Sequence, residues 1–97
     1  MEFSVNITVE DCCQSKCCTN RQCTTKIFTN LTDFICLQNG YSFKIISVTN
    51  SQVVIDITNG TLHFIRISYP GIIQKICLPI NCGCHIITFV INSIESV

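Results

Sequence analysis

The segment Val53-Val54-Ile55-Asp56-Ile57-Thr58-Asn59-Gly60-Thr61-Leu62-His63-Phe64-Ile65 carries the clearest structural signal in the chain. Two apolar, β-branched runs flank its Asn-Gly dipeptide. This dipeptide favours a two-residue hairpin turn, because both of its residues accept a positive φ. The segment therefore predicts a β-hairpin, whose register sets three pairs of residues opposite one another: Ile57 with Leu62, Ile55 with Phe64, and Asp56 with His63.

The pattern of this hairpin continues on both sides along the chain. A similar turn at Asn50-Ser51 would place Val48 opposite Val53 and Ile46 opposite Ile55. The core face predicted for this meander consists of Ile46, Val48, Ile55, Ile57, Leu62 and Phe64. Further β-rich runs predict strands, and no segment keeps a helical period with a capping signal. We therefore expect an all-β fold, a single antiparallel β-sandwich, with strands at 3–9, 25–31, 34–37, 43–49, 52–58, 62–69, 73–78 and 85–94.

Residues 3–9 alternate between apolar and polar side chains, which is typical of a half-buried strand. This strand precedes a cysteine-rich segment, so we expect that its partner is not its neighbour in sequence. Two interpretations stay open. It is an edge strand of its own domain, or it is donated to the sheet of a neighbouring subunit.

Five of the nine cysteines lie within twelve residues: Cys12, Cys13, Cys17, Cys18 and Cys23. Adjacent Cα atoms are about 3.8 Å apart, which is too close for the usual disulfide separation of about 4.4–6.8 Å. Each doublet must therefore bond elsewhere, and an odd total leaves at least one thiol over. The sulfurs bind zinc or copper, form bridges within the chain, or form bridges between chains. The metal site is disfavoured because the chain has no Cys-x2-Cys spacing.

The other cysteines and the histidines give weaker signals. We interpret Cys36 and Cys77 as small buried hydrophobes, whereas Cys82 and Cys84 flank Gly83 at a strand entrance that sulfurs from outside could reach. His85 is interpreted as a polar surface residue. A facing Asp and His on neighbouring strands are ordinary cross-strand partners, so we expect neither catalysis nor a cofactor.

The composition limits the classes of partner. The 97 residues carry no net charge and are 47% hydrophobic. Without a basic stripe nucleic acid is not expected, and no apolar run reaches the length of a membrane span. A sparsely charged, apolar chain is expected to associate with itself. Residues 1–23 predict an N-terminal strand and a cysteine-rich connector arm, and residues 24–97 predict the sandwich body. The first residues do not form a signal peptide, and the leading Met favours synthesis in a cytosol with later oxidation.

The layout resembles the endospore appendage (Ena) fibre subunits of spore-forming Firmicutes. Those proteins have an N-terminal connector with a Cys-Cys doublet, similar to Cys12-Cys13 or Cys17-Cys18. A single cysteine precedes their first body strand, like Cys23, and another enters their last strand, similar to Gly83-Cys84-His85. This chain differs in having two doublets, a β-like segment before them, extra cysteines and a shorter body.

The resemblance implies a jelly-roll body and connector cysteines that bond to preceding subunits. It implies that Cys12, Cys13, Cys17 and Cys18 supply the arm sulfurs, with Cys23 and Cys84 as acceptors and Cys36, Cys77 and Cys82 as other possible disulfide residues. The expected function is a subunit of an extracellular, disulfide-cross-linked fibre on a spore or cell surface. Its partners would be further copies of itself and a related co-assembling subunit. The alternatives are a monomeric, internally bridged secreted binding or toxin-like module, and a thiolate metal-binding protein.

Overall fold

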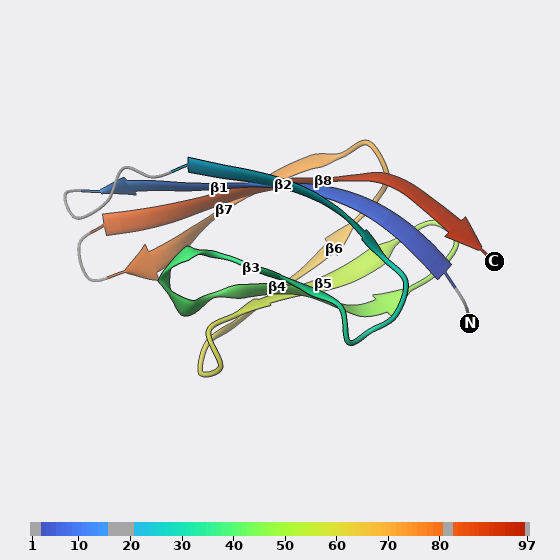
Figure 1. Ribbon diagram of the computed structural model, residues 1–97, viewed down its shortest axis with the longest axis horizontal. Helices are drawn as coiled ribbons and strands as arrows, with labels where there is room; N and C mark the ends of the chain where they lie inside the picture. Colours follow the sequence, from blue (N-terminus) through green and yellow to red (C-terminus); the bar gives the residue numbers. More distant parts are fainter. Residues whose placement is uncertain (1–2, 16–20, 81–82, 97) are drawn as a thin grey trace.

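The computed structural model describes residues 3–15, 21–80 and 83–96, which form two antiparallel sheets packed face to face (Figure 1). The predicted all-β sandwich is confirmed. The first sheet has the strand order β2-β1-β8-β7, and the second has the order β3-β4-β5-β6. The elements are β1 (Phe3–Ser15), β2 (Arg21–Phe28), β3 (Phe34–Cys36), the 3-10 helix η1 (Gln38–Gly40), β4 (Ser42–Val48), β5 (Val53–Thr58), β6 (His63–Ser68), β7 (Ile73–Ile80) and β8 (Gly83–Ser96).

The connectivity is that of a meander. The four strands of the second sheet lie side by side in chain order, and the first sheet joins the N-terminal hairpin β1–β2 to the C-terminal hairpin β7–β8. In a jelly roll, the long connections of two Greek keys bring non-consecutive strands together in both sheets. The two-layered sandwich is therefore as expected, while its strand order differs from a jelly roll.

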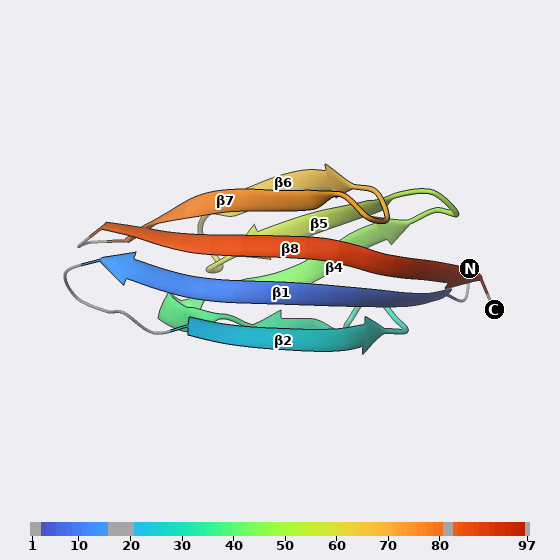
Figure 2. The same cartoon turned by 90° about the horizontal axis from the view of Figure 1, so that it is seen from above.

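Strand β1 occupies an interior position of the first sheet, between β2 and β8 (Figure 2). The prediction of an edge strand or a donated strand was wrong, and β1 does pair with its sequence neighbour β2. The strand also runs on to Ser15, so residues 3–15 and 21–23 belong to the sheet. A connector arm separate from the body is therefore not confirmed. The alternation of residues 3–9 could not reveal this, because an interior strand with one buried face has the same period as an edge strand.

The hairpin β5–β6 forms at the predicted place with a different register. Thr58 lies opposite His63, and Ile57 lies opposite Phe64. The loop is longer than two residues because the Asn59 side-chain oxygen accepts hydrogen bonds from the backbone N–H groups of Thr61 and Leu62, at 3.0 and 2.8 Å. Such a local side-chain bond offers the backbone an alternative to the tight turn.

A β-bulge at Ile46 changes which side chains of β4 reach the core. The register with β5 shifts between Ile45 and Ser47. The extra residue therefore reverses which alternate side chains of β4 point into the core. Ile45 lies opposite Ile55 and is buried, whereas Ile46 is 45% exposed. Val48 pairs with Val53 as predicted. Of the predicted core face, Ile55 and Ile57 are buried, Val48 and Phe64 pack at its margin, and Ile46 and Leu62 are exposed.

Side chains from both sheets interdigitate in the core. Phe43 of β4 lies between Phe28 of β2, at a ring-centroid distance of 6.3 Å, and Phe89 of β8, at 5.2 Å in an edge-to-face arrangement. All three rings are at most 1% exposed. Burying each ring stabilises the fold by about 1.5–3 kcal/mol. The sandwich therefore has an apolar core of its own, which fixes the strands that carry the sulfurs.

Candidate functional site

Four sulfur-bearing residues lie on one face of the first sheet, toward one end. Inward-facing neighbours such as Leu78 are fully buried, whereas Cys12 and Cys84 are partly exposed and Cys23 and Cys77 are exposed. This follows from the two-residue period of the strands, because alternate residues point to opposite faces. The fold thus brings residues from all four strands of the sheet to its outer surface.

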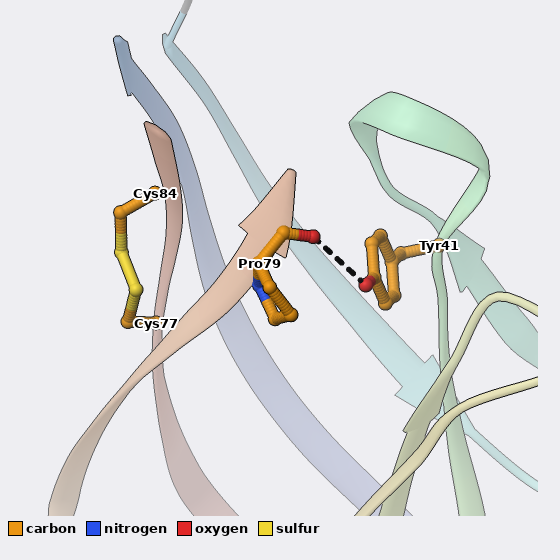
Figure 3. The surroundings of a disulfide bond; sticks show 4 residues. All are labelled: Tyr41, Cys77, Pro79 and Cys84. Atoms are coloured by element: carbon orange, nitrogen blue, oxygen red, sulfur yellow. Dashed lines mark hydrogen bonds between the residues drawn. A yellow bond between two sulfur atoms is a disulfide. The ribbon is translucent and has the colours of Figure 1, made fainter. Parts of the chain in front are cut away.

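Cys77 and Cys84 are joined by a disulfide across the β7–β8 hairpin, with a Cα–Cα distance of 5.6 Å. Figure 3 shows this bond on one side of the hairpin, while Tyr41 lies on the other side and its hydroxyl donates a 3.3 Å hydrogen bond to the Pro79 carbonyl. The resemblance implied that Cys84 accepts a bond from another chain. Here Cys84 is bonded within its own chain, because the hairpin brings Cys77 to it. Cys77 is exposed, so its interpretation as a buried hydrophobe was wrong.

Three cysteines of the described residues are free thiols: Cys12, Cys23 and Cys36. Cys12 and Cys23 lie in the first sheet, and Cys36 lies in β3 of the second sheet. Cys36 is exposed, so the interpretation of this residue as buried was wrong. The outward-facing position on an edge strand, opposite Ser42, explains its exposure.

Several predicted site residues are only partly placed or not placed. The backbone of Cys13 pairs with His85 in the β1–β8 ladder, and its side chain lies outside the described part of the structure. Cys17, Cys18 and Cys82 lie outside the described residues. The bonding that the sequence suggested for these four residues stays a prediction.

A charged pair lies next to the two free thiols of the first sheet. Arg21 lies opposite Cys12, Glu10 lies opposite Cys23, and the Arg21 guanidinium donates a 2.8 Å hydrogen bond to the Glu10 carboxylate. The pKa of Arg21 is raised above its ordinary value, first by the hydrogen bond to Glu10 and then by the negative charge of Glu10. The pair therefore places one positive and one negative charge directly across from the two free thiols.

A buried polar cluster occupies the inner face at the same end. The Asp11 carboxylate contacts Nε2 of His85 and accepts a 2.7 Å hydrogen bond from the backbone N–H of Gln38. The Gln38 side chain donates to the Asp11 carbonyl at 3.3 Å, and the Asn39 amide lies 3.4 Å from Nδ1 of His85. Because η1 connects β3 to β4, this cluster fastens the first sheet to the second.

The surroundings of His85 oppose its protonation. The side chain is fully buried, and the Tyr41 ring packs against it in an edge-to-face arrangement with a centroid distance of 6.2 Å. Burial lowers the pKa of His85 below its ordinary value, and the negative charge of Asp11 only partly opposes this shift. We infer that His85 is neutral at physiological pH.

Placing His85 on the surface was wrong, because its side chain is fully buried beside Asp11, which is itself 2% exposed. The alternation of inward and outward residues along β1 and β8 already indicated that both side chains are buried. Asp11 has the same parity as Val9, and His85 has the same parity as Ile87, so both continue a buried row. Extending each period through the polar residue would have placed both in the core.

Asp56 and His63 contact one another, as their proximity in the hairpin suggested. Their Oδ2 and Nδ1 atoms are 2.9 Å apart, although they are diagonal neighbours rather than opposite ones. The His63 side chain is 54% exposed.

In the described ranges, no group of three or more His, Cys, Asp or Glu residues is arranged to hold a metal ion. None of the helical segments that the structure describes has the length and apolarity of a membrane span.

The chain matches no family model, no curated protein and no solved structure.

Proposed function

We propose that this protein is the structural subunit of a self-assembling extracellular fibre that is cross-linked by disulfides. The observation that carries the proposal is the presence of free, solvent-reaching thiols on both sheets: Cys12 and Cys23 on the first and Cys36 on the second. A subunit with a single reactive thiol can only form a dimer, whereas thiols at separate positions allow a chain of subunits to grow. Rigid strands hold these sulfurs at fixed relative positions.

Non-covalent association would precede the covalent bonds. Each sheet has two edge strands, β2 and β7 in the first and β3 and β6 in the second, which offer unpaired backbone groups. Large apolar side chains are exposed on or near these edges, and the chain carries no net charge to oppose association. The exposed apolar residues include Ile27, Phe34, Ile65, Ile67 and Ile73.

The resemblance to endospore appendage subunits extends this proposal to place and partner. Disulfides persist in oxidising surroundings, so the fibre would mature on a spore or cell surface after synthesis in a mother cell. Cys12 would act from a strand of the sheet, while Cys13, Cys17 and Cys18 would supply further bonds to neighbouring copies or to a related co-assembling subunit.

The test is polymer length under non-reducing conditions. Wild-type protein oxidised in air should give a ladder or material retained in the well, which collapses to monomer on reduction. The variant Cys12→Ser/Cys23→Ser/Cys36→Ser should give a shorter ladder, and Thr25→Ser, also on β2, should leave it unchanged. Electron microscopy should show filaments in the wild-type sample only while disulfides are intact.

A discrete wild-type monomer, whose disulfides all lie within the chain, would overturn the fibre. That outcome would favour the second candidate, a monomeric bridged module, with which the Cys77–Cys84 bond is equally compatible.

A further inference from the structure

Diagonal neighbours on adjacent strands contact each other repeatedly in this fold. In the disulfide, Cys84 lies opposite Pro79, and its partner Cys77 is two residues before Pro79. The same offset recurs in three polar contacts: Arg21 with Glu10, His63 with Asp56, and His85 with Asp11. The right-handed twist of paired strands explains this recurrence, because it shortens one diagonal of each pair at the expense of the other.

Cys12 has the same offset from Cys84. Across the β1–β8 ladder Cys84 lies opposite Gln14, and Cys12 is two residues before Gln14. The register is continuous from Ile7 to Ser15, so no bulge separates the two positions. Cys84 on β8 is therefore flanked on the outer face by Cys77 on one neighbouring strand and by the free thiol Cys12 on the other.

From this placement we propose that Cys12, Cys84 and Cys77 form a thiol–disulfide exchange site within one chain. The Cys12 thiol releases its proton to water, and its thiolate attacks the sulfur of Cys84. A Cys12–Cys84 bond forms, the Cys77–Cys84 bond breaks, and Cys77 leaves as a thiolate that takes a proton from water. The numbers of disulfides and thiols do not change, so the step needs no oxidant or reductant.

The strand order favours this reaction over others among the same sulfurs. Attack on a disulfide is most favourable when the incoming sulfur approaches opposite the leaving sulfur, and β1 and β7 lie on opposite sides of β8. Cys23 has the opposite offset from Cys12 and is a strand further from Cys84. The exchange moves the free thiol from the interior strand β1 to the exposed Cys77 of the edge strand β7.

The exchange can be followed by trapping thiols with N-ethylmaleimide. Dilute wild-type protein is incubated at pH 8 without added thiol, quenched at intervals and digested with trypsin, and tandem mass spectrometry then locates the label and the linked cysteines within the peptides. Labelled Cys77 and a peptide linking Cys12 to Cys84 should increase together, at a rate independent of protein concentration. Cys12→Ser should lose both signals, and Cys36→Ser, the matched free-thiol control, should keep both.

A second pair of variants tests the juxtaposition even if the wild-type equilibrium favours the Cys77–Cys84 bond. Cys77→Ser frees Cys84, and oxidised glutathione should then produce the Cys12–Cys84 link. Cys84→Ser frees Cys77, which is two strands from β1, so no Cys12–Cys77 link should form. A folded Cys77→Ser protein without the Cys12–Cys84 link, or Cys77 labelling that survives in Cys12→Ser, would overturn the proposal. Because the site lies within one chain, it stands or fails independently of the fibre.

Discussion

The two histidine–aspartate pairs, one in each sheet, have the same diagonal geometry in opposite surroundings. The Asp11 and His85 side chains are 3% and 0% exposed, whereas those of Asp56 and His63 are 14% and 54% exposed. The first pair also accepts a hydrogen bond from Gln38 and lies beside Asn39, so it joins the two sheets. Because water weakens an exposed pair far more than a buried one, we expect burial, rather than the contact itself, to decide how much each pair contributes to stability.

Removing the buried carboxylate should have the largest effect. Asp11→Ala leaves two buried groups without their acceptor, the Gln38 N–H and the His85 ring, so the free energy of unfolding should fall by about 2–6 kcal/mol. The matched change Asp56→Ala should lower it by less than about 1 kcal/mol. Urea unfolding of both variants, in the same disulfide state, measures the difference. Equal losses would show that burial does not separate the pairs.

The pH dependence of stability should come from the buried histidine. Because the folded-state pKa of His85 is lowered, the unfolded chain binds a proton more readily below about pH 6.5. Stability should therefore decrease as the pH falls through this region, by at most about 1.4 kcal/mol per pH unit.

Urea unfolding between pH 7.5 and pH 5 measures this slope. The chain has only two histidines, so His63→Gln is a natural control and should keep the dependence. His85→Gln should reduce it, and an unchanged slope in that variant would contradict the assignment.

The hydroxyl that links the sheets near the buried pair should have a moderate effect. Tyr41→Phe keeps the ring against His85 and loses the hydrogen bond to the Pro79 carbonyl. The free energy of unfolding should fall by about 0.5–1.5 kcal/mol. Tyr69→Phe is the control, because Tyr69 is 48% exposed, and it should change stability by less than about 0.5 kcal/mol. A smaller loss for Tyr41→Phe than for Tyr69→Phe would contradict a role for the hydroxyl.

Changing the exposed histidine should have the smallest effect. His63→Gln at pH 7.5 should alter the free energy of unfolding by less than about 0.5 kcal/mol, since exposed pairs are weakened by water and by side-chain entropy. Thermal unfolding measures this, and raising the salt concentration should change the unfolding temperature little in both the wild type and this variant. A loss above about 2 kcal/mol would mean that the Asp56–His63 contact is as important as the buried one.

The strand content could be predicted from the sequence, whereas most of the strand registers could not, the pairing of Val48 with Val53 excepted. The run Val53-Val54-Ile55-Asp56-Ile57-Thr58 forms the predicted strand because its β-branched residues and period are local properties. The register across the following turn was wrong because hydrogen bonds of the Asn59 side chain decided the loop. The inward turn of Ile45 rather than Ile46 depended on a bulge that no local pattern marked.

By itself, the sequence determined that the chain forms a β-sandwich and that its cysteine doublets cannot close on themselves. Both conclusions rest on local properties of the chain. The strands follow from the alternation and the β-branched residues of each segment, and the doublets from the short distance between adjacent Cα atoms. Only the tertiary structure decided that β1 lies inside the first sheet, that Cys84 bonds to Cys77, and that Asp11 reaches His85. These features depend on which strands become neighbours, and that choice follows from burying apolar faces from the whole chain in one core.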